Sequence, residues 1–178
     1  MNFPDSTLRS RTTQSPILES IRDRLIEKVE DYNDQNCFVD DQSIPISLPG
    51  GRIGCTISPG GGRFPSEFFT GGGADTMVED ASVIVTPIIV TRIDRPRRSS
   101  RRILGDDVGS KGILWYKREI LIALFADDMW EPRLGDQPLC RDQIAPVNVE
   151  APSDAVIGEA TATAMRITIS TPFDWSLR

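Results

Sequence analysis

The sequence predicts an α+β fold, in which a mostly antiparallel sheet carries two main helices on one face. Two segments place apolar residues at helical spacing, and two others show the β-branched runs or the alternation of strands. The elements follow the order helix, short strands, long strand, helix, long strand, and long Gly- and Pro-rich loops separate them. We therefore expect residues 15–178 to form a single domain, and the polar, aperiodic residues 1–14 to form a flexible N-terminal arm.

The first helix is predicted over residues 15–32. Ser15 suits the N-cap position, and Pro16 suits the first turn, where its missing N–H costs nothing. One face of this segment is apolar, and its main members are Ile17, Ile21, Leu25 and Val29. Charged residues occupy the opposite face, so the helix is expected to bury only one side.

Residues 37–70 are interrupted every few positions by Pro or Gly, which leaves room for short extended pieces such as 44–48 and 52–57. Glycine triplets follow at 58–64 and 69–75. Neither triplet continues into the G-K-[ST] or G-x-G-x-x-G patterns that cradle phosphate, so both are predicted to be surface loops.

The strongest strand signal covers residues 83–93, which are β-branched almost throughout. Pro87 lies inside it and has no N–H to donate to a neighbouring strand. The sequence therefore predicts an edge position or a β-bulge at this proline.

A second helix is predicted over residues 111–130, because about 15 residues without Gly or Pro exceed the usual length of a strand. It carries two neighbouring apolar stripes. The first consists of Ile113, Tyr116, Ile120 and Leu124, and the second of Leu114, Leu121 and Phe125.

The last part of the chain begins with a long excursion over residues 131–159, which Pro and Gly again interrupt. Residues 160–172 then alternate as a half-buried strand that is expected to end near Pro172. Its buried face would contain Thr163, Met165, Ile167 and Ile169.

Composition argues against several classes of protein. No apolar run approaches the roughly 20 residues that span a bilayer, and no secretion signal is visible, so synthesis in the cytoplasm and no membrane partner are expected. The chain has no histidine, the commonest general base and metal ligand. Cys37, Cys55 and Cys140 lack C-x-x-C spacing and are expected to be reduced thiols. No catalytic residue, metal or cofactor is predicted. A small enzyme with a carboxylate-based or metal-dependent site that the sequence does not reveal is the least favoured hypothesis, after the two functions described below.

Arginine is concentrated in one segment of a chain whose formal net charge is −6. Between residues 92 and 102 there are six arginines and one acid, Asp94. Such a segment suits contact with DNA phosphates, with an acidic face of a neighbouring protein, or with solvent alone. Low aromatic content speaks against a nucleic-acid platform, and the choice of arginine over lysine favours bidentate contacts with carboxylates.

The order of these elements resembles that of tail terminators and related head-to-tail joining proteins of tailed bacteriophages. The resemblance covers about residues 15–175 and depends chiefly on the helical segment KREILIAL and the terminal PFDW. The segments 94–112 and 130–158 are long for a minimal member of that family. The resemblance implies a non-enzymatic virion protein of the tail or neck that forms a ring, most often six-fold, and caps the tail tube below the head connector.

For such a ring, contacts with neighbouring subunits, the tail tube, the sheath or the head connector are expected from the loops at 58–76 and 94–112. DNA would be met only as the genome passes through the channel. The candidate contact residues are Arg63, Phe68, Phe69, Arg92, Arg95, Arg97, Arg98, Arg101 and Arg102. The alternative function is a nucleic-acid-associated protein that binds phosphate through the basic loop 92–102.

Overall fold

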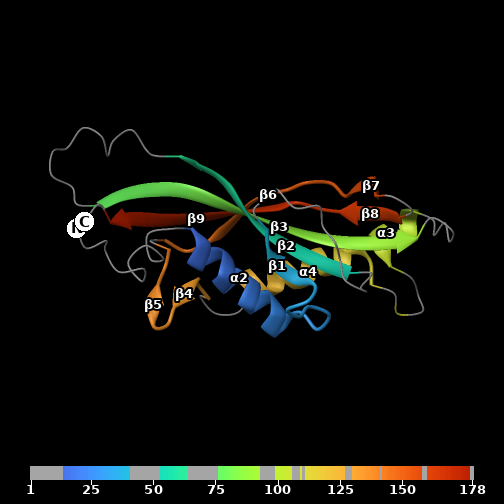
Figure 1. Ribbon diagram of the computed structural model, residues 1–178, viewed down its shortest axis with the longest axis horizontal. Helices are drawn as coiled ribbons and strands as arrows, with labels where there is room; N and C mark the ends of the chain where they lie inside the picture. Colours follow the sequence, from blue (N-terminus) through green and yellow to red (C-terminus); the bar gives the residue numbers. More distant parts are fainter. Residues whose placement is uncertain are drawn as a thin grey trace, which may run out of the picture.

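The computed structural model describes residues 14–40, 53–63, 76–92, 99–105, 109, 111–126, 130–140, 142–157 and 160–176. Over these ranges a seven-stranded sheet runs along the whole molecule, with its two longer helices on one side (Figure 1). This arrangement confirms the predicted α+β class and the mostly antiparallel sheet. Residues 1–13 of the arm predicted at 1–14 lie outside the described ranges, and so do the predicted loop residues 41–52 and 64–75.

The central strand of the sheet is β3 (Thr76–Arg92), which pairs on both sides. Its 17 residues extend over roughly 55 Å at the usual rise of a strand. On one side lies β2 (Ile53–Arg63), followed by the short parallel strand β1 (Cys37–Val39). The long predicted strand is thus confirmed, and it begins earlier than the β-branched run.

On the other side of β3, one antiparallel strand is divided into β8 (Ala160–Ala164) and β9 (Ile167–Ser176). The division falls where Pro87 faces Met165. The Met165 N–H still donates to the Pro87 carbonyl at 3.3 Å, but proline has no N–H to return the bond. The prediction of an edge position or a β-bulge at Pro87 is therefore wrong: the sheet keeps this proline inside with a continuous register on both sides, and the neighbouring strand is interrupted instead.

Strand β2 corrects the interpretation of the first glycine triplet as a surface loop. Residues 60–62 belong to the strand, and the register against β3 shifts by one residue between Pro59 and Gly62. A Cβ atom at Gly60 would come within 2.8 Å of the Ser82 carbonyl oxygen. Glycine here permits a β-bulge and close approach of two backbones, so its usual meaning as a strand breaker does not apply.

The outer edge of the sheet comes from the excursion that the sequence left without strands. Strand β6 (Ala145–Val149) pairs with β9, and β7 (Ser153–Ile157) pairs with β8. A separate small hairpin contains β4 (Arg133–Leu134) and β5 (Gln137–Pro138). Strand β9 also runs through Pro172, beyond its predicted end.

Two helices, α2 (Ser15–Lys28) and α4 (Ile113–Phe125), lie on the same side of the sheet in Figure 1, and the short third helix α3 (Ser99–Leu104) lies near the end of β3. The first two confirm the predicted pair. Ser15 is not the N-cap, because Gln14 takes that position and its side-chain amide donates to the Ser82 carbonyl at 2.7 Å. This bond fastens the start of α2 to the central strand.

A single apolar core joins α2, α4 and the sheet face beneath them. The predicted inward stripes of both helices are buried, and so is the predicted inner face of 163–169. Trp115 and Trp130 pack against this core and remain partly exposed. The core thus uses one face of each helix and leaves the other to solvent.

Candidate functional site

The arginine segment is described only at its ends. Arg92 is the last residue of β3, opposite Ala160, while Arg101 and Arg102 lie on the short helix α3. Arg95, Arg97, Arg98, Phe68 and Phe69 are outside the described residues. Arg63 ends β2 opposite Asp80, with its side chain exposed. The structure does not bring the described candidates together in one site.

Arg102 makes an internal contact. Its Nη2 lies 2.7 Å from the Asp154 Oδ2 atom on β7, and its side chain is only 12% exposed. The Thr163 hydroxyl donates to the other oxygen of the same carboxylate. This contact joins α3 to the outer edge of the sheet and holds Arg102 within the fold, whereas the described residues show no ion pair for the exposed Arg101 beside it.

The two donors also change the chemistry of the acid. The hydrogen bond from Thr163, and then the bond and charge of Arg102, hold the pKa of Asp154 below its usual range. Asp154 therefore stays ionised in the folded protein at any pH near neutral.

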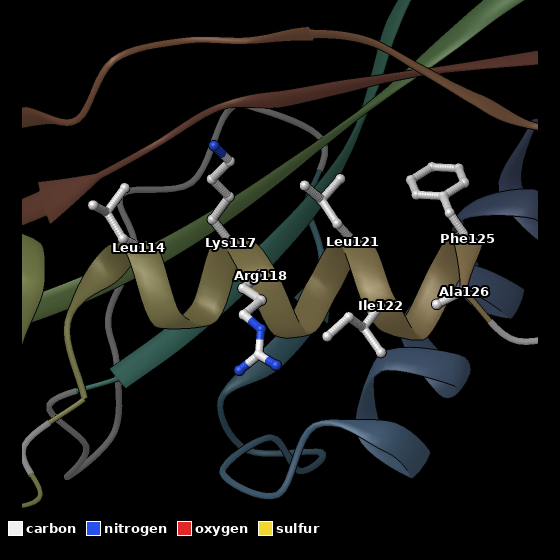
Figure 2. A pocket seen from close by; sticks show the side chains of 7 residues that line it. All are labelled: Leu114, Lys117, Arg118, Leu121, Ile122, Phe125 and Ala126. Carbon is white, nitrogen blue, oxygen red and sulfur yellow. The ribbon is translucent and has the colours of Figure 1, made fainter.

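One side of α4, next to the stripe that is buried in the core, carries a partly exposed apolar surface. Figure 2 shows seven residues along it, which line a shallow depression of about 550 Å³: Leu114, Lys117, Arg118, Leu121, Ile122, Phe125 and Ala126. Leu114 is 37% exposed and Ile122 is 39% exposed. The second stripe predicted from the sequence, Leu114, Leu121 and Phe125, runs through this surface.

We call these seven residues the α4 outer stripe. Two cations interrupt its apolar side chains: Arg118, which lies 3.7 Å from Glu119, and Lys117, for which the described residues show no ion pair. Sequence reasoning recorded the apolar part of the stripe but not its exposure. The sequence carries no signal for this exposure, because two neighbouring apolar stripes also fit one wide core-facing surface, and Leu121 and Phe125 do pack partly against the core.

The N-terminal end of α4 is held firmly, which fixes the direction of the stripe. Lys111 lies 2.7 Å from Asp31 and 3.0 Å from Glu30, both just beyond α2, and the Tyr116 hydroxyl donates to Asp31 at 2.9 Å. The Asp31 hydrogen bond raises the pKa of Lys111, and burial followed by Asp31 raises that of Tyr116. These contacts anchor α4 to α2, and the raised pKa values keep Lys111 charged and Tyr116 neutral near pH 7.

The three thiols are buried and unpaired, as expected for reduced cysteines. Cys37 and Cys55 face each other in β1 and β2, with Tyr32 nearby. Burial raises the pKa of Cys55 strongly and that of Cys140 to about 12. Thiols in such surroundings are poor nucleophiles and metal ligands.

A second surface is the far end of the β3–β9 pair. From Thr76–Ser176 to Glu79–Phe173 the two strands pair only with each other among the described residues, since β2 ends opposite Asp80 and β6 begins opposite Ser170. In Figure 1 this ribbon extends past the helices. Unpaired strand edges of this kind can accept a further strand.

Neither comparison with known proteins produced a relative: no protein-family model matches the chain, and no curated protein does. Among the described residues, no group of three or more Cys, Asp or Glu side chains is placed to hold a metal ion. None of the described helices is long and apolar enough to cross a membrane.

Proposed function

We propose that this protein is a non-enzymatic structural subunit of a phage or phage-tail-like particle, acting as a tail terminator or neck ring component. It would assemble into a closed ring, six-fold in the commonest case, that caps the tail tube and meets the head connector. The host cytoplasm would be its place of synthesis and the virion tail or neck its final location.

The observation that carries this proposal is the α4 outer stripe. An apolar helix face of this length is stabilised when another protein surface covers it, and the rigid anchoring of Lys111 presents it in one fixed direction. The open β3–β9 ribbon supplies a second surface on another part of the molecule. Two different surfaces on one chain suit head-to-tail contacts, which close into rings when the rotation permits.

The resemblance noted in the sequence supplies the particular kind of ring. The confirmed order of α2, β3, α4 and the β8–β9 strand is the order on which that resemblance depends. The choice of a tail or neck ring over other assemblies comes from this resemblance alone.

The test is the mass of the purified protein in solution, measured by light scattering at low and high salt, with and without double-stranded DNA. A multi-subunit species without DNA, seen as rings with a central channel by electron microscopy, is the expected result. A strict monomer that gains mass only with DNA would contradict the ring and favour the nucleic-acid alternative. Under that alternative Arg101 is available for phosphate, whereas Arg102 is held by Asp154.

A further inference from the structure

The α4 outer stripe has the composition of a contact between helices. Leu114, Arg118, Leu121, Ile122 and Phe125 follow the spacing i, i+4, i+7, i+8, i+11, which lines up side chains along one face of a helix. Leu121 and Phe125 pack partly against the core, whereas Leu114 and Ile122 are exposed apolar side chains that the core does not cover. The two cations of the stripe restrict what can cover it.

A symmetric contact between two copies of the stripe is disfavoured. Placing α4 against α4 of a second copy would bring Lys117 and Arg118 close to the same cations of the partner. Like charges in a partly dehydrated interface cost several kcal/mol. The best partner for the α4 outer stripe is therefore a helix surface whose acidic side chains recur at helical spacing.

The outer face of α2 is such a surface. Glu19, Asp23 and Glu27 are exposed at intervals of four residues, and the half-buried Ile26 lies among them. Their spacing of i, i+4, i+7 and i+8 is the same as that of the α4 outer stripe from Leu114 to Ile122. We call these four residues the α2 acidic stripe.

Both stripes are available on the same copy. The α2 core stripe of Ile17, Ile21 and Leu25 is buried, so the acidic stripe faces away from the core. Arg22 lies 2.7 Å from Asp23, and Glu27 has two neighbouring cations, Lys28 at 3.3 Å and Arg24 at 3.7 Å. These exposed neighbouring pairs compensate the acids only partly, since exposed ion pairs are weak and readily exchange partners.

We infer that the α4 outer stripe of one copy docks on the α2 acidic stripe of the next. Lys117 and Arg118 would meet Asp23 and Glu27 around an apolar centre formed by Leu121, Ile122 and the partner's Ile26. The two stripes are different surfaces, so the contact is heterologous and repeats from copy to copy. This inference rests on the proposed ring and names the surfaces that close it.

A charge exchange tests the contact. One variant carries Lys117→Glu with Arg118→Glu, and the other carries Asp23→Lys with Glu27→Lys. Each alone places like charges across the contact and is expected to lose the oligomer, giving the mass of a monomer by light scattering. An equimolar mixture restores opposite charges at every contact and is expected to recover the wild-type mass, with both variants in the complex.

The matched control is Asp142→Lys with Glu150→Lys, which reverses two exposed acids that belong to neither stripe. It should keep the wild-type mass. All substituted side chains in the two variants are at least partly exposed, and circular dichroism with thermal unfolding checks that each variant folds. A misfolded variant is replaced by the single substitutions Arg118→Glu and Glu27→Lys, tested by the same mixing.

The outcomes separate the inference from the proposed function. Wild-type rings that persist in both variants, or variants that stay monomeric after mixing, would overturn the α4–α2 contact and leave the ring intact. A wild-type protein that is monomeric at every concentration would overturn both.

Discussion

The guanidinium of Arg102 and the carboxylate of Asp154 lie 2.7 Å apart, although 52 positions separate them in the sequence. Their contact ties α3 to the outer edge of the sheet. It also means that two adjacent arginines have different roles, since Arg101 is exposed and Arg102 is largely buried.

We expect Arg102→Ala to lower the free energy of unfolding by about 1 kcal/mol, because the Asp154 carboxylate loses a charged partner but is still partly hydrated. Arg101→Ala should change it by less than about 0.5 kcal/mol, the usual range for an exposed side chain. Urea denaturation of the two alanine variants measures the difference. Equal losses in both variants would show that the contact does not stabilise the fold.

The stability that the Arg102–Asp154 contact contributes to the fold should depend on pH. The pKa of Asp154 is lowered from its usual 3.8, so the folded state binds this proton less readily than the unfolded state. The stability gained from the carboxylate is therefore present above pH 3.8 and is lost as the pH falls below that value through the lowered pKa. Asp154→Asn should be less stable than wild type at pH 6, and the gap should narrow towards pH 2.5. A gap that stays constant over this range would contradict the assignment.

The β-bulge in β2 gives a pair of glycines for comparison. Gly60→Ala places a methyl group against the Ser82 backbone and should cost about 1–3 kcal/mol of stability. Gly61→Ala meets nothing within 4 Å and should be close to neutral. Thermal unfolding of both variants is the measurement, and similar melting temperatures would mean that the two backbones are not in close contact.

Thiol reactivity tests the core. Cys37, Cys55 and Cys140 are buried, and burial raises the pKa of the last two, so the native protein should react only slowly with an aromatic disulfide reagent at pH 8. In denaturant all three thiols of the sequence should react at once. A thiol that reacts in the native state as fast as free cysteine would show that its strand opens readily.

The long periodic elements could be predicted from the sequence. Apolar residues recur over several turns in α2 and α4, and over several alternations in the strand residues 163–169. The core buries the predicted side of each of these three elements. The Pro and Gly rules failed inside strands. At Pro87 and Gly60, pairing with neighbouring strands outweighs local preference, and this pairing cannot be seen in a single segment.

The candidate site was harder to predict. Local sequence does not tell Arg101 from Arg102, because only the short helix α3 and the distant strand β7 decide which side chain points inward. The second stripe of α4 was visible as a pattern, but its exposure depends on how much core the sheet provides. In the sequence alone, Lys117 and Arg118 look like ordinary solvent-exposed charges. Only the position of α4 in the fold shows that they lie within the apolar stripe.

The central position of β3 also determines the order in which the chain can fold. Its pairing with β2 closes a local hairpin, whereas its pairing with β9 joins Thr76 to Ser176 at the far end of the sequence. Loop-closure entropy makes the local hairpin the faster step and the distant pairing the slow one. A nascent chain therefore exposes one edge of β3 until β9 has left the ribosome, and this edge is where misassembly between unfinished copies would begin.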